Sequence, residues 1–147
     1  MSQVSFENRT VIVTGAGNGL GKAYALELGS RGARVVVNDL GGAVDGSGSG
    51  NTPADEVVNE IIANGGEAVA NYDSVATKEG GASIVQTAID NFGTVDAVVN
   101  NAGILRDKSF ANMSEEELSL ILDVHLKGTC VVSQPAFRVM KEIADGR

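Results

Sequence analysis

Three glycines at a distinctive spacing are the residues best suited to bind a ligand. Gly15, Gly19 and Gly21 lie between an apolar run, residues 10–14, and a stretch with apolar residues at helical spacing, residues 20–31. We expect these glycines to join a buried strand to a helix. The amino end of such a helix directs unpaired N–H groups toward an anion. Because glycine has no Cβ, a pyrophosphate can approach the turn closely.

The same spacing argues against ATP hydrolysis at this turn. A P-loop would need glycine where Ala16 stands, and a hydroxyl residue where Ala23 follows Gly21 and Lys22. The spacing also differs from the commoner dinucleotide fingerprint, in which the first two glycines are two residues apart. A glycine turn of this general kind occurs in methyltransferases and flavoproteins as well, so neighbouring residues must decide the ligand.

An aspartate narrows the choice of ligand. Asp39 follows a second apolar run, residues 34–38, and lies 18 residues after Gly21. A carboxylate at this place can accept hydrogen bonds from both hydroxyls of an adenosine ribose. It would repel the 2′-phosphate of NADP, and Asn18 supplies no positive charge to offset that repulsion. The predicted cofactor is therefore NAD, and the alternative is an aspartate that only begins a loop.

The elements that must position these residues alternate along the chain. Continuously apolar strands that alternate with helices indicate a Rossmann-like α/β fold, a doubly wound parallel sheet with helices on both faces. We expect the first four strands of such a sheet, with the remainder missing. The predicted strands are residues 10–14, 34–38, 67–71 and 96–100, and the predicted helices are residues 20–31, 54–64, 83–92 and a last helical region from Ser114 toward Ile143.

Several local signals mark the boundaries of these elements. Ser114 and Glu117 form a capping-box pattern. We expect Pro135 to bend the last helical region or remove one of its hydrogen bonds. Residues 40–51, rich in glycine and serine, are interpreted as a mobile surface loop beside the cleft or as an inserted loop without function. Thr52 before Pro53 predicts a helix start, and the predicted helix ends are Gly32, Gly65 and Gly93.

Composition limits the class of protein. The chain has 147 residues, 43% of them hydrophobic, and a net charge of −8, which suits one globular domain over residues 1–147. Its negative field disfavours nucleic acids and anionic membranes. Cys130 is the single cysteine, so no internal disulfide or thiolate metal site is expected. Without a signal sequence or a long apolar run, the predicted location is cytoplasmic, with peroxisomal as the alternative.

Together these motifs resemble the short-chain dehydrogenase/reductase family. The matching motifs are Thr14-Gly15-x-x-x-Gly19-x-Gly21 and Asn100-Asn101-Ala102-Gly103, the second of which argues against a methyltransferase. Residues 37–42, 70–75 and 101–107 resemble the 3-hydroxyacyl-CoA dehydrogenase unit of the peroxisomal multifunctional enzyme type 2 group, and the similarity covers essentially the whole chain. The resemblance implies hydride transfer between NAD and a secondary alcohol, such as a 3-hydroxyacyl-CoA, by a homo-oligomer.

The resemblance also implies a set of cofactor-binding residues. By carry-over, Leu20 packs on the cofactor, residues 73–75 flank the adenine, and residues 101–103 line the nicotinamide ribose. These positions follow successive strands, where open α/β sheets bind ligands. The full implied set is Gly15, Asn18, Gly19, Leu20, Gly21, Asp39, Asp73, Ser74, Val75, Asn101, Ala102 and Gly103.

His125 is the candidate for proton transfer. It stands where much of the family has an asparagine that organises a proton relay, and the type 2 enzymes resemble this chain in having histidine there. Imidazole can exchange protons near neutral pH, and the helical spacing predicts that His125 faces inward. The alternative is a core histidine paired with a backbone carbonyl.

The catalytic serine and the Tyr-x-x-x-Lys motif of the family are not in the sequence. Tyr24 and Tyr72 are followed four residues later by Leu28 and Ala76. Hydride transfer needs a group that exchanges the proton of the substrate hydroxyl. We therefore expect the cofactor-binding portion of a dehydrogenase, cut short before those residues. The alternative is a non-catalytic dinucleotide-binding or regulatory module.

Overall fold

The computed structural model describes residues 4–41 and 52–146. Four parallel strands form one sheet in the order β3-β2-β1-β4, as the Rossmann-like prediction requires. The strands are β1 (Thr10–Thr14), β2 (Arg34–Asn38), β3 (Glu67–Asn71) and β4 (Ala97–Val99). The order reverses beside β1, because β2 and β3 extend to one side of it and β4 pairs on the other. Open α/β sheets bind ligands at such a reversal, beyond the carboxyl ends of the strands.

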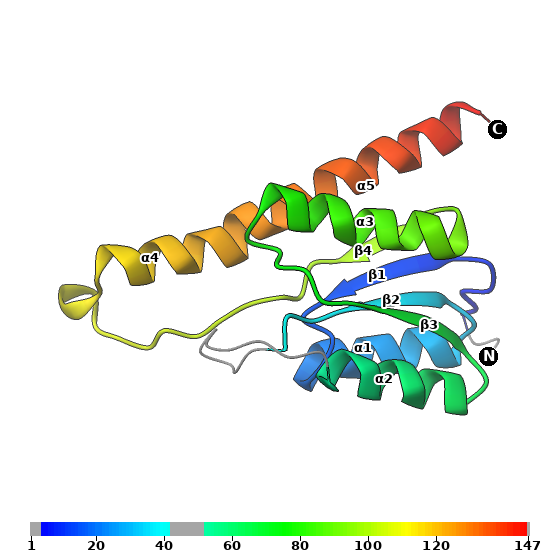
Figure 1. Ribbon diagram of the computed structural model, residues 1–147, viewed down its shortest axis with the longest axis horizontal. Helices are drawn as coiled ribbons and strands as arrows, with labels where there is room; N and C mark the ends of the chain where they lie inside the picture. The colour runs from blue at the N-terminus through cyan, green and yellow to red at the C-terminus, as the bar shows by residue number, and fades with distance from the viewer. Residues whose placement is uncertain (1–3, 42–51, 147) are drawn as a thin grey trace.

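Helices cover both faces of the sheet (Figure 1). Helices α1 and α2 lie on one face, and α3 and α5 lie on the other. Helix α4 lies past the carboxyl ends of the strands, in a long helical rod that continues into α5. The helices are α1 (Gly19–Ser30), α2 (Thr52–Ala63), α3 (Lys78–Phe92), α4 (Glu115–Leu122) and α5 (Gly128–Asp145), with a 3-10 turn, η1 (Phe110–Asn112), and a π-helical segment, η2 (Asp123–Lys127).

The core consists of two layers separated by the sheet. Val11 and Val13 of β1 pack in one cluster with residues of α1 and α2, while Ile12 packs in the other with residues of α3 and α5. All three valine and isoleucine side chains are buried. Successive side chains of a strand point to opposite faces, so a continuously apolar strand fills both layers. Each such side chain contributes about 1.5–3 kcal/mol through burial.

Most predicted boundaries are confirmed. The predicted bounds of β1, β2 and β3 match the structure, and the capping box of Ser114 and Glu117 is present at the start of α4. Helix α2 already includes Thr52, one residue before the predicted first helical position. The predicted loop, residues 40–51, lies mostly outside the described residues. Gly32, Gly65 and Gly93 follow helices with φ of 89°, 85° and 75°, as predicted.

Helix α3 begins five residues earlier than predicted, at Lys78. Thr77 caps it, because its side chain accepts a hydrogen bond of 3.0 Å from the Gly80 N–H. Gly80 and Gly81 resemble helix breakers in the sequence, yet both lie inside α3 and are buried. A Cβ at Gly81 would collide with the backbone carbonyl of Val131 in α5. The glycine therefore permits close packing of α3 on α5.

Pro135 does not end the last helical region. Helix α5 continues through it to Asp145, and α4, η2 and α5 form one long rod in Figure 1. Proline has no N–H for the carbonyl one turn earlier, which here is that of Val131, the carbonyl that packs against Gly81. The π-helical segment was not predicted from the sequence. A π-helical segment joins residues five apart by hydrogen bonds, and a segment of only five residues is too short to give a distinct apolar periodicity in the sequence.

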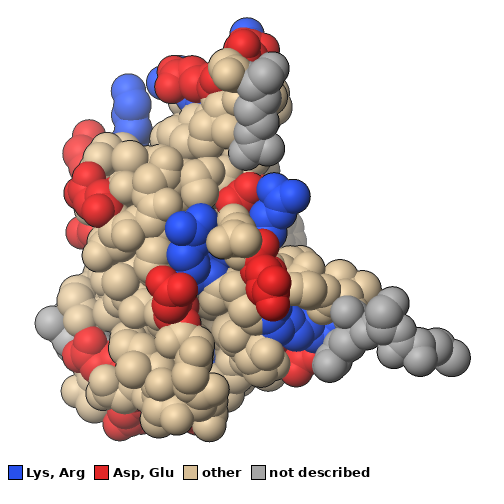
Figure 2. Space-filling view, turned by 90° about the vertical axis from the view of Figure 1, so that its right-hand side faces the viewer, with Lys and Arg blue, Asp and Glu red and all other residues tan. Residues whose placement is uncertain are grey.

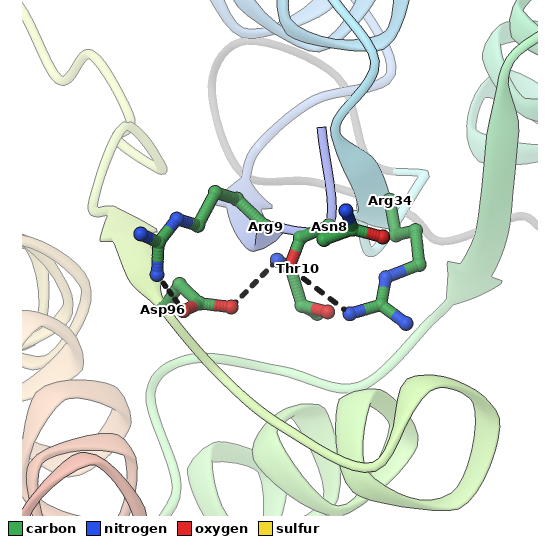
Figure 3. A network of polar contacts seen from close by, with 5 residues as sticks. All are labelled: Asn8, Arg9, Thr10, Arg34 and Asp96. Carbon is green, nitrogen blue, oxygen red and sulfur yellow. Dashed lines mark hydrogen bonds and ion pairs between the residues drawn. The ribbon is translucent and has the colours of Figure 1, made fainter. Parts of the chain in front are cut away.

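The amino end of the sheet is held by a polar network (Figure 3). Asp96 accepts hydrogen bonds of 2.9 Å from the Arg9 guanidinium and from the Thr10 N–H, and Arg34 donates to the carbonyl of Asn8 at 3.2 Å. The predicted fourth strand covered residues 96–100, whereas β4 covers only Ala97–Val99, and the Asp96 side chain before it bonds the start of β1. Figure 2, which faces this end, shows acidic and basic side chains interspersed.

Two further properties concern the described part of the chain. None of its helices combines the length and the apolar character needed to cross a membrane. No group of three or more histidine, cysteine, aspartate or glutamate side chains in it is placed to hold a metal ion.

Candidate functional site

A cleft of about 530 Å³ opens at the carboxyl ends of the strands. Its volume lies in the range of about 300–1,000 Å³ that is usual for small-molecule sites. Residues that follow each of the four strands contribute to its wall. Eleven of the twelve implied cofactor-binding residues line it: Gly15, Asn18, Gly19, Leu20, Asp39, Asp73, Ser74, Val75, Asn101, Ala102 and Gly103.

The twelfth residue, Gly21, lies buried behind the wall, where a Cβ would collide with the carbonyl of Gly15. Its role in the structure is close packing of α1 on the turn. Sequence reasoning missed four residues of the wall: Asn38, Leu40, Ile104 and Val124. All four directly adjoin a residue that was singled out, so position beside a motif is the signal that could have found them.

The glycine turn forms one side of the cleft. Gly15 and Gly19 have φ of 62° and 55°, in the left-handed region that favours glycine. A Cβ at Gly15 would lie 2.8 Å from the Cα of Ala102, whereas a Cβ at Gly19 would meet no atom within 4 Å. Open space therefore borders the backbone of Gly19, where α1 begins. The amino end of a helix next to open space is a suitable place for an anion.

Hydrogen bonds connect this turn to the segment after β4. The Thr14 hydroxyl accepts from the backbone N–H groups of Asn101 at 3.1 Å and Ala102 at 3.0 Å. In return, the Asn101 side chain donates to the carbonyls of Thr14 and Gly15, both at 3.0 Å. The amide of Asn101 thus holds the turn in place, so that two walls of the cleft are fixed relative to each other.

Asp39 stands at the end of β2 with a half-buried side chain. Its Oδ2 accepts a hydrogen bond of 2.8 Å from the Gly17 N–H, and its Oδ1 accepts one of 2.7 Å from the Gly41 N–H. These two backbone donors fix the orientation of the carboxylate. A carboxylate has about four acceptor positions, so Asp39 retains capacity for further donors on the cleft side.

Tyr72 is bonded in a way that does not suit proton transfer to a substrate. Its hydroxyl donates to Asp55 Oδ1 at 2.5 Å, which joins the end of β3 to the first turn of α2. This hydrogen bond to a carboxylate raises the pKa of Tyr72 above its ordinary value of 10.0. A tyrosine that takes a proton from a substrate needs a lowered pKa, so Tyr72 does not substitute for the catalytic tyrosine of the family.

The prediction that His125 faces inward is wrong for the structure, because its side chain is exposed. The ring nevertheless lies against the cleft wall: its Nε2 is 2.9 Å from the Ile104 carbonyl oxygen and 3.1 Å from the Ile104 N–H nitrogen. A Cβ at Gly103 would lie 2.8 Å from the imidazole Cε1. The backbone contact of the alternative interpretation is therefore present at the surface rather than in the core: Nε2 accepts from the Ile104 N–H in one tautomer and donates to the Ile104 carbonyl in the other.

Residues 9–147 match the family model described as short chain dehydrogenase. The chain belongs to the short chain dehydrogenase family. This assignment agrees with the parallel sheet, the 15-19-21 glycine turn and its connection to the Asn101 segment.

Two relatives that match nearly the whole chain have names that include dehydrogenase or multifunctional enzyme. The chain is 56% identical to the peroxisomal hydratase-dehydrogenase-epimerase of Saccharomyces cerevisiae over 98% of its length, which is 16% of that protein. It is 54% identical to the peroxisomal multifunctional enzyme type 2 of Mus musculus over 99% of its length, which is 20% of that protein.

A solved structure has the same fold. It is a short chain dehydrogenase from Mycobacterium avium, with a TM-score of 0.88 and 47% identity, and the match covers 97% of this chain and 49% of that chain. The chain thus spans half or less of the length of these relatives.

Proposed function

We propose that this chain binds NAD and is the cofactor-binding part of a dehydrogenase that exchanges hydride with a secondary alcohol. The position of Asp39 carries the proposal. A carboxylate fixed by two backbone N–H groups borders a cleft of dinucleotide-compatible size, on the same wall as the glycine turn. Family membership supports nicotinamide chemistry, and Asp39 supports NAD over NADP because a 2′-phosphate would meet a like charge.

The residues of the cleft fit a dinucleotide. The open space beside Gly19 and the amino end of α1 suits a pyrophosphate. The free acceptor positions of Asp39 suit the two hydroxyls of the adenine ribose. Leu20 exposes its side chain on the wall, where it can pack on a planar group. With residues 73–75 on the wall for the adenine, the site offers a feature for each part of the adenosine diphosphate moiety.

In this proposal the chain binds and orients, while NAD supplies the hydride acceptor when bound. Asn101 holds the glycine turn against the segment after β4. The parts of the cleft that would take the phosphates and the nicotinamide are therefore fixed relative to each other. His125 holds the peptide of Ile104 through Nε2. We propose that its other ring nitrogen exchanges protons with a water in place of the family's relay asparagine.

The finer features of the proposal are supported by the relatives. A 3-hydroxyacyl-CoA substrate is supported by the resemblance of residues 37–42, 70–75 and 101–107 to the dehydrogenase unit of type 2 multifunctional enzymes. A peroxisomal location, the second of the two predicted, is supported by the names of two relatives. Homo-oligomerisation is supported by exposed apolar side chains along the α4–α5 rod, Leu118, Leu122, Leu126 and Phe137.

Calorimetric titration of NAD and NADP tests the cofactor assignment. We expect the unmodified chain to bind NAD more tightly. Asp39→Arg should weaken NAD roughly 10- to 150-fold, because a hydrogen bond to a charged group is worth about 1.5–3 kcal/mol, and should improve NADP. Asp90→Arg makes the same change at an exposed site on α3 and should leave both affinities unchanged.

The outcomes separate the alternatives. Equal affinity of the unmodified chain for NAD and NADP would refute the selectivity, and absence of NAD binding would refute the proposal. Affinity for S-adenosylmethionine without affinity for NAD would favour a methyltransferase. NAD binding by an intact natural protein that never reduces the cofactor would favour the non-catalytic module.

A further inference from the structure

Two buried asparagines lie near Asp73, Asn38 on the cleft wall and Asn71 behind it. Asn38 and Asn71 end the neighbouring strands β2 and β3 and pair in register, and their exposures are 2% and 6%. Asn71 does not line the cleft, whereas Asp73, two residues later, does. Burial of an amide side chain is costly unless its donors and acceptors are satisfied. The partners of Asn71 therefore indicate what it does.

Every hydrogen-bonding position of the Asn71 amide is used. Its Oδ1 accepts from Asn38 Nδ2 at 2.9 Å and from the Asp73 N–H at 3.0 Å. Its Nδ2 donates to Asp73 Oδ2 and to the Thr87 hydroxyl, both at 2.9 Å. An amide offers two donors and two acceptor positions, so this pattern defines which end is nitrogen. The nitrogen end faces the carboxylate.

Asp73 is held from three elements at once. Its Oδ2 accepts from Asn71 of β3 and, at 2.7 Å, from the Ser83 hydroxyl of α3, and its backbone carbonyl accepts from Asn38 of β2 at 2.9 Å. Among the described residues, both side-chain hydrogen bonds to this carboxylate end on Oδ2. Oδ1 is consequently the oxygen left for a ligand in the cleft.

We propose that Asn71, assisted by Ser83, is a positioning residue that fixes Asp73 so that Oδ1 reads the amino group of a bound nucleobase. The inference rests on the proposed NAD-binding function. A carboxylate oxygen accepts a hydrogen bond from the amino group of adenine and repels the carbonyl oxygen that hypoxanthine has in its place. The network thereby sets the selectivity of the site for adenine over hypoxanthine, in addition to stabilising the fold.

The test compares the dissociation constants of NAD and nicotinamide hypoxanthine dinucleotide by calorimetry. We expect the unmodified chain to prefer NAD by roughly tenfold. Asn71→Asp has nearly the same shape, but an ionised carboxylate cannot donate to Asp73 Oδ2 and repels it. The preference should fall severalfold, toward equality. Asn91→Asp makes the same change at an exposed end of α3 and should leave the preference unchanged.

A second variant keeps the test decisive if Asn71→Asp does not fold. Ser83→Ala removes one of the two hydrogen bonds to Oδ2 at a half-buried position and should lower the preference by a smaller factor. If Asn71 had a purely structural role, its substitution would lower the melting temperature and weaken the binding of both dinucleotides equally. An unchanged preference for NAD in the folded variants would therefore overturn this inference but not the proposed function. Failure of the unmodified chain to bind NAD would overturn the proposed function, and the inference with it.

Discussion

The two ends of the sheet contain similar side chains that are bonded in different ways. At the amino end, the carboxylate of Asp96 is bonded on both oxygens to its own neighbours, Arg9 and the Thr10 N–H (Figure 3). At the carboxyl end, the carboxylates of Asp39 and Asp73 are also fixed by protein donors, but they line an open cleft. Charged groups are thus present at both ends, and at the carboxyl end the fixed carboxylates of Asp39 and Asp73 line an open cleft.

This difference is the feature that, in our proposal, makes the carboxyl end a binding site. An acceptor that is oriented before the ligand arrives needs little reorganisation on binding. At the amino end the same type of group contributes to folding, because its bonds hold β1 and β4 together. We therefore expect substitutions at the two ends to separate ligand affinity from stability.

The largest effect is expected for Gly15→Ala at the carboxyl end. A left-handed backbone costs a residue with a Cβ about 1–2 kcal/mol, and overpacking against Ala102 adds about 1–3 kcal/mol. NAD affinity should also fall at least about tenfold, because the turn must move. Denaturant unfolding and calorimetry measure the two effects.

Gly65→Ala is the matched control for this change. Gly65 also has positive φ, but a Cβ there would meet no atom within 4 Å, and the residue lies away from the cleft. The Gly65→Ala variant should lose only the stability that a left-handed backbone costs a residue with a Cβ, about 1–2 kcal/mol. It should bind NAD as tightly as the unmodified chain. Similar losses of affinity in both variants would contradict the special role of the turn.

At the amino end, Asp96→Asn should destabilise the fold by about 1–3 kcal/mol and leave NAD affinity within about twofold. The side chain is 14% exposed and bonds both Arg9 and the start of β1. Urea unfolding gives the stability, and titration of the folded variant gives the affinity. A marked loss of NAD affinity in a fully folded variant would show that the two ends are coupled.

A smaller effect concerns the pH dependence of stability at the start of α4, where charged side chains also stabilise the fold. The hydrogen bond from Lys108 and that from the Ser114 backbone hold the pKa of Glu117 below its ordinary value of 4.5. A lowered folded-state pKa gives stability that is present above pH 4.5 and is lost as the pH falls through the folded-state pKa. The protection factor of the Glu117 amide, whose N–H bonds Ser114, should therefore fall in acid once its exchange rate is corrected for the intrinsic pH dependence of amide exchange.

Lys108→Met should reduce this pH dependence, because it removes the main cause of the lowered pKa. Equal protection of the Glu117 amide above and below the folded-state pKa of the Glu117 carboxyl would show that the ion pair and the capping box do not stabilise the start of α4.

The sequence was most informative where one physical requirement dominates. Strands β1, β2 and β3 are buried on both faces, so their continuous apolar runs define their bounds. Most of the cleft residues were implied by the resemblance to the family, and their positions agree with the rule that open α/β sheets bind ligands where parallel strands end. Asp39 was singled out because a carboxylate in that position can accept hydrogen bonds from both hydroxyls of a ribose, and its place on the cleft wall agrees with that prediction.

Prediction failed where partners distant in sequence decide the structure. Gly81 lies inside a helix at the point where α5 packs closely on it, with the Val131 carbonyl where a Cβ would be. The exposed position of His125 depends on the segment around Ile104, which helical periodicity does not include. The role that we propose for Asn71 depends on its hydrogen bond to Thr87 of α3, which lies sixteen residues later in the chain. In the sequence alone, an asparagine at the end of a strand resembles a turn signal.

The central claim, that NAD binds at the carboxyl end of the sheet, is tested most directly by nuclear magnetic resonance of the ¹⁵N-labelled chain titrated with NAD. We predict that the backbone amide signals of Gly17, Gly19 and Asp73 shift, while those of Thr10 and Asp96 stay unchanged. Shifts centred on Thr10 and Asp96, or no shifts at saturating NAD, would contradict the account.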